Sequence, residues 1–112
     1  TQARGPSIGR SRVSDDIMRH VGVRGRVQGV GYRAFVEDEA MQRRLRGWVR
    51  NRRDGSVEAV FAGPRTVVEA MIEACRRGSA SARVSALDQR EGTQTDLSEA
   101  ARGGFFEVLP TV

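Results

Sequence analysis

Residues 21–36 read VGVRGRVQGVGYRAFV and combine two different patterns in one short segment. The first half alternates apolar and polar residues, which predicts a half-buried strand over residues 19–27. Glycines then mark a loop, and the spacing of apolar residues that follows predicts a helix over residues 32–46. A glycine-rich loop that leads from a strand directly into a helix favours an anion, because the free N–H groups of the first helical turn point at the ligand.

The rest of the chain supplies four more elements and a short final strand. The patterns predict strands over 47–51, 56–62 and 82–90, a helix over 65–77 that ends at Gly78, a polar connection over 92–103 with one helical turn capped by Asp96, and a strand over 104–109. This order predicts an α+β fold, a ferredoxin-like βαββαβ sandwich in which two helices cover one face of an antiparallel sheet, with a short fifth strand in addition.

Length and composition restrict the class of protein. The chain has 112 residues and one cysteine, so we expect one folded domain over residues 18–112 and no internal disulfide. Residues 1–17 are polar and without periodicity, and we expect a disordered N-terminal extension there. No run of apolar residues has the length of a membrane span or the pattern of a signal peptide, so a cytoplasmic protein is expected.

The net charge of +5 invites a nucleic-acid interpretation, but the composition argues against it. All 19 basic residues are arginine and none is lysine, which indicates a genome-wide codon preference rather than selection at each site. Acidic residues are spread among the arginines, so a mixed surface is the favoured interpretation and no nucleic-acid partner is expected.

The predicted topology brings two distant segments together. Strands one and two run in the same direction with strand three between them, so their C-terminal ends lie at the same edge of the sheet, roughly 10 Å apart. The first end carries the glycine loop, and the second carries Asn51. Taken alone, Asn51 fits a turn residue as well as a site residue.

Arg33 lies in the first turn of the predicted helix, where a cation is mildly unfavourable for the helix itself. Its planar guanidinium matches phosphate oxygens two at a time, which suggests a function in binding phosphate. Two other phosphate motifs are disfavoured. The spacing Gly29-x-Gly31-x-x-Ala34 fits a dinucleotide fingerprint formally, but a hairpin follows instead of repeated strand–helix units. A Walker loop needs a lysine, which the chain lacks.

Two motifs then resemble a known family. Residues 25–33 (GRVQGVGYR) and 47–51 (GWVRN), the latter followed by DGSVE at 54–58, are similar to the two signatures of the acylphosphatases. The resemblance runs from about residue 19 to 111 and implies a small stand-alone enzyme that hydrolyses acyl phosphates without a cofactor or metal. It implies that Arg33 and Asn51 are the catalytic pair and that the loop binds the substrate phosphate through Gln28, Gly29, Val30, Gly31, Tyr32 and Arg33.

The chemistry of the residues agrees with this resemblance. The carboxylate that leaves an acyl phosphate comes from an acid with a pKa near 4, so it needs no general acid. Backbone amides and Arg33 supply charge stabilisation, and the amide of Asn51 can hold a water molecule as donor and acceptor. The substrate phosphate itself is expected to accept the proton of that water.

Two departures from the family pattern affect local shape. Arg43 and Arg44 stand where relatives usually carry leucine and then glycine, so either Arg44 adopts a left-handed conformation at a cost of order 1 kcal/mol or the helix ends differently. After Gly78, the pair Ser79-Ala80 stands where proline is common.

The remaining alternatives are an RNA-binding module and a segment of a larger maturation protein. The same topology serves RNA-binding domains, but Tyr32 and Phe35 lie in a predicted helix and not on a strand. The absence of zinc-finger cysteines favours a stand-alone enzyme. His20 is expected at the surface, Cys75 in the core, and the expected partner is a small acyl phosphate bound by a monomer.

Overall fold

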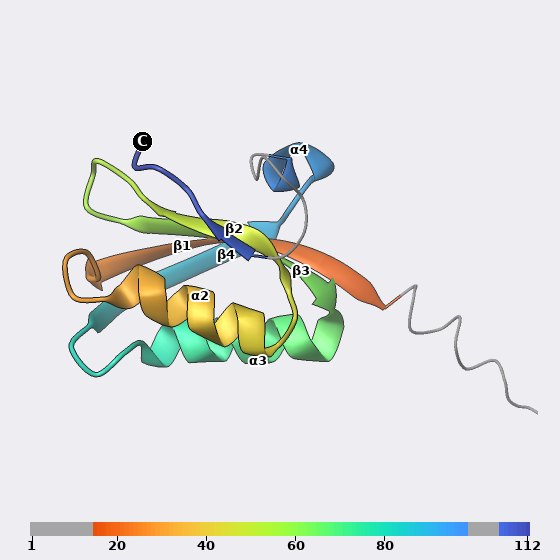
Figure 1. The fold of residues 1–112 in the computed structure, drawn as a ribbon, viewed down its shortest axis with the longest axis horizontal. Coiled ribbons are helices and arrows are strands. Elements are labelled where there is room, and N and C mark those ends of the chain that lie inside the picture. Colours follow the sequence, from red (N-terminus) through yellow and green to blue (C-terminus); the bar gives the residue numbers. More distant parts are fainter. Residues whose placement is uncertain (1–14, 99–105) are drawn as a thin grey trace, which may run out of the picture.

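The computed structural model describes residues 15–98 and 106–112, which form five strands and three helices. Along the chain these are β1 (Asp16–Arg26), α2 (Tyr32–Gln42), β2 (Arg46–Asn51), β3 (Val57–Pro64), α3 (Arg65–Arg77), β4 (Arg83–Glu91), α4 (Gln94–Leu97) and β5 (Phe106–Val108). The predicted α+β, ferredoxin-like arrangement is confirmed: α2 and α3 lie side by side on one face of a single sheet (Figure 1).

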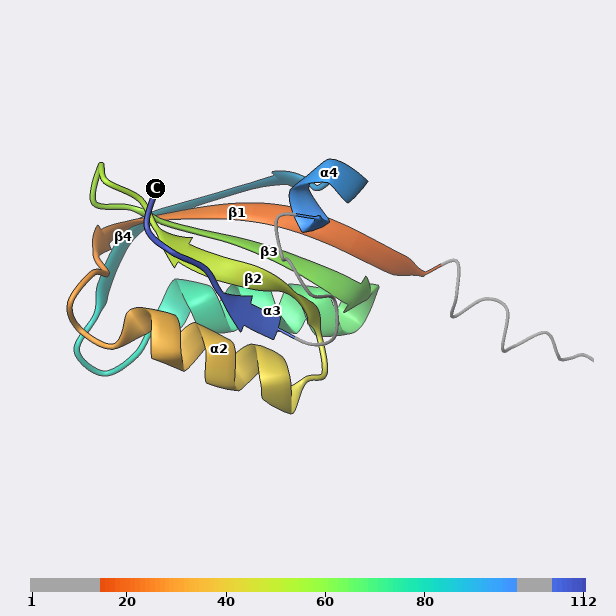
Figure 2. The same cartoon turned by 45° about the horizontal axis from the view of Figure 1, so that its top comes forward.

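The strand order across the sheet is β4-β1-β3-β2-β5 (Figure 2). β3 pairs antiparallel with both β1 and β2, and β4 pairs antiparallel with β1. β5 is an exception to the antiparallel sheet expected from the sequence, because it pairs parallel with β2. β4 runs antiparallel to β1 and ends beside the start of β1. β5, the next strand in the chain, pairs with the start of β2 at the same end of the sheet and therefore runs in the same direction as β1 and β2.

The main core fills the space between the sheet and the two long helices. Val21, Val23, Val57, Ala59 and Phe61 are buried on the sheet side, as the alternating pattern predicted. The helices contribute Val36, Ala40, Val68, Met71, Ile72 and Cys75. Because every second residue of a strand faces this core, the intervening residues lie on the opposite face of the sheet.

A second, smaller cluster covers part of that opposite face. Trp48, Val60, Ala62 and Leu97 are buried there, and the indole Nε1 of Trp48 donates to the carbonyl of Asp96 at 2.8 Å. The predicted cap of α4 was wrong by three residues. Thr93 is the N-cap, and its side chain and that of Asp96 accept each other's backbone N–H in a capping box.

Helix α2 ends at Gln42 and not at Arg46, which corrects the sequence prediction. Arg44 has a φ of 57°, and the N–H groups of Arg44 and Leu45 donate to the carbonyls of Met41 and Ala40, both at 3.0 Å. These two bonds form a Schellman motif, in which a left-handed residue reverses the chain. Leu45, fully buried behind it, explains why the turn is kept without glycine.

The N-terminal boundary differs slightly from the expected one. β1 begins at Asp16, so Asp16 and Ile17 pair with Pro64 and Gly63 although the folded domain was expected to start at residue 18. Residues 1–14 of the predicted extension lie outside the described residues, and the division into an extension and a domain stays a prediction. Among the described helices, none is long and apolar enough to cross a membrane.

Replacing Arg44 by glycine should stabilise the protein. A left-handed L-residue costs about 1–2 kcal/mol, and glycine loses about 0.4–1 kcal/mol more backbone entropy on folding. We therefore expect Arg44→Gly to raise the free energy of unfolding by about 0.5–1 kcal/mol, measured by urea denaturation.

Arg43→Gly is the matched control, because Arg43 has ordinary right-handed angles and pairs with Glu39. It should lower the free energy of unfolding by about 1 kcal/mol. Equal effects of the two substitutions would contradict the assignment of strain to Arg44.

Candidate active site

The loop between β1 and α2 has the backbone of an anion site. Gly29 and Gly31 have φ values of 74° and 78°, in the left-handed region that favours glycine. A methyl group added to either would meet no protein atom within 4 Å, so backbone conformation, and not packing, requires glycine here. Within the described part of the chain, no N–H group from Gly29 to Ala34 donates to a protein acceptor. Successive free N–H groups ahead of a helix make a concave donor surface for an anion.

Arg33, the second residue of α2, is half-buried and lies beside these N–H groups. Among the described residues its guanidinium has no hydrogen-bond or ion-pair partner. The positive end of the α2 dipole disfavours a cation at this position. An anion held by the loop would relieve this repulsion and occupy the free donors of Arg33.

Asn51 ends β2 at the same edge of the sheet. It pairs with Val57 of β3, and Val57 also pairs with Val23 near the end of β1. The topology therefore brings the loop and Asn51 to one edge, as the sequence predicted. The side-chain Oδ1 of Asn51 is buried and has no partner among the described residues. A buried acceptor without a partner is costly, so the site retains a group that can bind water or substrate.

The side chain of Gln28 does something that the sequence did not reveal. Its Nε2 donates to the carbonyl of Arg52 at 2.7 Å and to the carbonyl of Ser56 at 2.8 Å. Both carbonyls belong to the β2–β3 hairpin that follows Asn51. The predicted contact of Gln28 with phosphate is thus limited to its backbone, because both hydrogens of the amide are already used.

The start of α2 is fixed to α3 by Tyr32. Its ring is buried and its hydroxyl donates to the carbonyl of Cys75 at 2.7 Å. Burial raises the pKa of Tyr32 far above its ordinary value and raises the pKa of the Cys75 thiol to about 12. Both groups stay protonated at neutral pH, so neither acts as a nucleophile or base, and Cys75 lies in the core as predicted.

An ion-pair cluster on the other face of the sheet holds the residues that flank Asn51. Glu58 accepts from Arg50 at 3.0 Å and from Arg52 at 2.9 Å, and its second oxygen lies 2.6 Å from Nε2 of His20. Burial alone would raise the pKa of Glu58, but the hydrogen bonds from His20, Arg52 and Arg50 outweigh it and lower the pKa to about 2. His20 is therefore less exposed than expected, and it lies on the face of the sheet opposite to Asn51.

Sequence reasoning missed this cluster although one signal was available. Arg50 and Glu58 are direct cross-strand partners, and opposite charges at such positions attract each other. The strand register that pairs Arg50 with Glu58 follows only when the exact geometry of the turn at Asp54-Gly55 is known.

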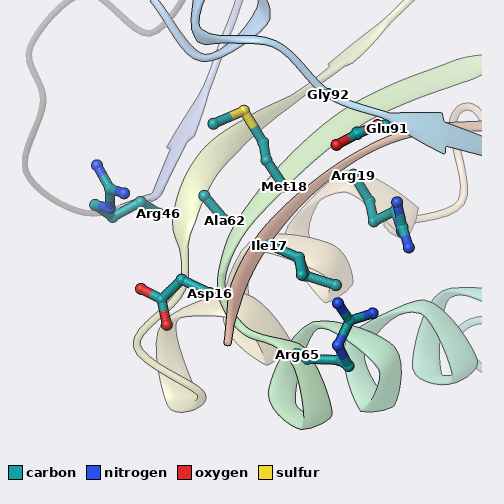
Figure 3. A pocket seen from close by; sticks show the side chains of 10 residues that line it. Asp16, Ile17, Met18, Arg19, Arg46, Ala62, Arg65, Glu91 and Gly92 are labelled. Atoms are coloured by element: carbon teal, nitrogen blue, oxygen red, sulfur yellow. The ribbon is translucent and has the colours of Figure 1, made fainter. Parts of the chain in front are cut away.

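Two cavities are formed without residues of the loop. One of about 510 Å³ is at the other end of the sheet, where β1 and β2 begin and β3 ends, and Figure 3 shows Arg19, Arg46 and Arg65 among its side chains. Another of about 330 Å³ lies over His20 and Glu58. Neither is lined by Arg33 or Asn51. The described residues contain no group of three His, Cys, Asp or Glu that could hold a metal ion.

Comparison with known proteins identifies the family. The acylphosphatase family model matches residues 19–101. The chain belongs to the acylphosphatase family. An acylphosphatase of Rhodopseudomonas palustris (strain BisB18) is 58% identical over 96 residues, which cover 86% of this chain and 97% of that relative.

Two solved acylphosphatases share the fold. The enzyme from Bacillus subtilis is 35% identical with a TM-score of 0.73, over 83% of this chain and 98% of that one. The enzyme from Coxiella burnetii is 31% identical with a TM-score of 0.75, over 88% of this chain and 97% of that one. The resemblance seen in the two sequence motifs is thereby confirmed, and the chain is an acylphosphatase by sequence and by fold.

Glu58 should make the stability of this acylphosphatase depend on pH. Its pKa is about 2 in the folded chain and about 4.3 in an unfolded one. The stabilisation is therefore complete above about pH 4.5 and is lost as the pH falls towards 2. On acid unfolding the Glu58→Gln variant should take up fewer protons than the wild type, by up to about one proton. Its free energy of unfolding, measured by urea denaturation, should therefore decrease less steeply as the pH is lowered over this range.

Glu69→Gln is the control, because Glu69 is exposed on α3 and has no ion pair in the described part of the chain. If the Glu58 variant keeps the wild-type pH dependence, the ion-pair cluster does not stabilise the folded state.

Proposed function

We propose that the β1–α2 loop, Arg33 and Asn51 together hydrolyse the carboxyl–phosphate bond of an acyl phosphate. The observation that carries this proposal is that these groups are unpaired within the described residues. The loop N–H groups, the guanidinium of Arg33 and Oδ1 of Asn51 have no partner within residues 15–98 and 106–112, and all belong to one edge of the sheet. The loop through Tyr32 and Arg33 binds the phosphate oxygens, and Gln28, Gly29, Val30 and Gly31 contribute backbone only.

The reaction needs little acid–base help from the protein. The oxygen of a water molecule bonds to phosphorus while the bond from phosphorus to the carboxyl oxygen breaks. The carboxylate leaves without a proton, since its acid has a pKa near 4. Transfer of the phosphoryl group mainly requires stabilisation of the charge on its peripheral oxygens and an attacking water in line. Preorganised N–H groups and Arg33 supply the stabilisation.

Asn51 orients the attacking water. Its carbonyl oxygen accepts a hydrogen bond from water and its NH₂ group donates one. Asparagine does not take up a proton near neutral pH, so the proton of the water passes to a phosphoryl oxygen of the substrate. His20 does not replace it as a base, because His20 is bound to Glu58 on the opposite face of the sheet.

The RNA-binding alternative gains no support. Tyr32 lies in α2 with its ring buried, and Phe35 packs against the core from the same helix. The aromatic residues of the described strands, Trp48, Phe61 and Phe106, are buried as well. Phe35 alone of these rings is partly exposed, and it lies on a helix. None of these rings is exposed on a strand of the sheet, which is where such modules stack bases.

Removing either side chain of the site should abolish most of the activity. We expect Arg33→Gln and Asn51→Ala each to lower kcat about 10²- to 10³-fold, as the loss of one preorganised donor does in other enzymes. Release of phosphate from benzoyl phosphate measures the rate, and circular dichroism establishes that each variant is folded.

Arg65→Gln is the matched control, because Arg65 starts α3 at the other end of the sheet and should leave the rate unchanged. A folded Asn51→Ala or Arg33→Gln protein with wild-type activity would exclude that residue from the mechanism. An inactive wild type that binds RNA with a steep salt dependence would favour the RNA-binding alternative instead.

The rate should be nearly independent of pH where histidine titrates. Because the phosphate of the substrate accepts the proton, we expect kcat to stay within about threefold between pH 5 and 8, in the wild type and in His20→Gln. A steep limb near pH 6 to 7 that disappears in His20→Gln would show that a histidine base takes part.

A monomeric state and a cytoplasmic location stay predictions from the sequence. The mixed distribution of charges supports a small substrate over a nucleic acid as the partner. Hydrolysis of small anions by one domain needs no second subunit in the proposed mechanism.

A further inference from the structure

We propose that Gln28 is a positioning residue, whose side chain sets the distance between the phosphate loop and Asn51. This inference rests on the proposed function, because it concerns the geometry between the two halves of that site. Gln28 lies in the loop that follows β1, while its amide group reaches the hairpin that follows Asn51.

The sheet itself does not join these two halves directly. β3 lies between β1 and β2, so the loop and Asn51 belong to strands that share no backbone pairing. Among the described residues, the two hydrogen bonds of Gln28 are the only ones that connect residues 27–34 with residues 51–56. The sheet and the core set the approximate position of the two halves, and this one side chain supplies the hydrogen bonds that fix the spacing between them.

The two carbonyls that Gln28 contacts form the neck of the hairpin. The carbonyl of Arg52 also accepts from the N–H of Gly55 at 3.0 Å, and the carbonyl of Ser56 also accepts from the N–H of Arg52 at 2.8 Å. Each carbonyl thus has both lone pairs used, and both hydrogens of Nε2 are used as well. Because all these groups are satisfied together, the neck cannot move relative to the loop without breaking a hydrogen bond.

The rest of the hairpin is equally constrained. Oδ1 of Asp54 accepts from the N–H of Ser56 at 2.9 Å and from its hydroxyl at 2.6 Å. On the other face, Glu58 holds the side chains of Arg50 and Arg52. Asn51 is therefore fixed to a rigid hairpin, and Gln28 fixes this hairpin to the loop.

A positioning role predicts a loss in the rate of the chemical step and not in the affinity for phosphate. The loop N–H groups and Arg33 remain when Gln28 is changed, and the start of α2 is still anchored through Tyr32 to α3. A displacement of about 1 Å between the water and the phosphorus can cost about 10²-fold in rate. Gln28 acts through Asn51, so its effect should vanish when Asn51 is absent.

The first experiment is a double-mutant cycle with Gln28→Ala and Asn51→Ala, using benzoyl phosphate as substrate and inorganic phosphate as inhibitor. We expect Gln28→Ala to lower kcat about 10- to 100-fold and to change the inhibition constant of inorganic phosphate by less than about threefold. In the Asn51→Ala background, Gln28→Ala should have little further effect. Gln89→Ala is the matched control, since Gln89 is exposed on β4 and should keep wild-type kinetics.

The second experiment uses Gln28→Glu, which keeps the shape of the side chain but replaces the NH₂ group that donates both hydrogen bonds. An ionised carboxylate repels the carbonyls of Arg52 and Ser56, whereas a protonated carboxyl can donate to one of them. The neighbouring oxygens raise the pKa of this carboxyl above about 4.3. The kcat of Gln28→Glu relative to wild type should therefore rise as the pH is lowered from 7 to 5, while the ratio for Gln28→Ala stays constant.

The outcomes separate this inference from the function on which it rests. Full activity of Asn51→Ala would contradict the proposed function itself. An inactive Asn51→Ala, combined with no effect of Gln28→Ala or with equal losses in both backgrounds, would overturn only the role of Gln28. If Gln28→Ala lowers the affinity for phosphate as much as it lowers kcat, Gln28 binds phosphate instead of positioning the hairpin. If Gln28→Ala does not fold, Gln28 stabilises the fold instead. Either result would also overturn the role of Gln28.

Discussion

The common direction of β1 and β2, imposed by β3 between them, is the constraint on which the rest of the structure depends. Because β3 pairs antiparallel with both, the C-terminal ends of β1 and β2 meet at one edge, and Val23 and Asn51 pair with the same residue of β3. A loop and a side chain from different parts of the chain therefore lie at one edge of the sheet, where the proposed mechanism has them contact one substrate. The core between the sheet and α2 and α3 keeps this register, since a shift by one residue would turn Val21, Val23, Val57 and Ala59 out of it.

The polar groups that this fold leaves without a hydrogen-bond partner indicate where the site lies. Most polar groups near the site have partners, such as the hydroxyl of Tyr32 and the amide of Gln28. The loop N–H groups, Arg33 and Oδ1 of Asn51 do not have one among the described residues. Of these groups Oδ1 of Asn51 is buried, and an unsatisfied buried polar group lowers stability, so its retention requires a compensating use. A phosphate oxyanion and a water molecule would satisfy all of them at once.

The parts that the sequence could predict are those encoded by local patterns. Alternation gave the faces of β1 and β3, the apolar stripe gave α3, and glycine spacing gave the loop, because each depends on residues that are close in the chain. The end of α2 was predicted less well, because the helix was expected to reach residue 46 and ends at Gln42. A left-handed Arg44 was one of the two alternatives that the sequence left open, and the structure has it. The bonds that join Gln28 to the hairpin and Glu58 to His20 connect residues 24 to 38 positions apart. Such contacts require the register of three strands, which no local pattern contains.

The chemistry of the leaving group explains how the ionisable residues around the site are used. A reaction that needed a general acid or base would require His20 or a carboxylate beside the phosphate. Here Glu58 is bound to two arginines and His20 on the far face of the sheet, with its pKa lowered to about 2. Because the departing carboxylate needs no proton, the mechanism does not require these groups as acids or bases. Their ion pairs instead hold the side chains on either side of Asn51. In the proposed mechanism the rigidity of the strand that carries Asn51 matters more than proton transfer, because a water molecule held by the neutral amide of Asn51 would react only when it is placed correctly.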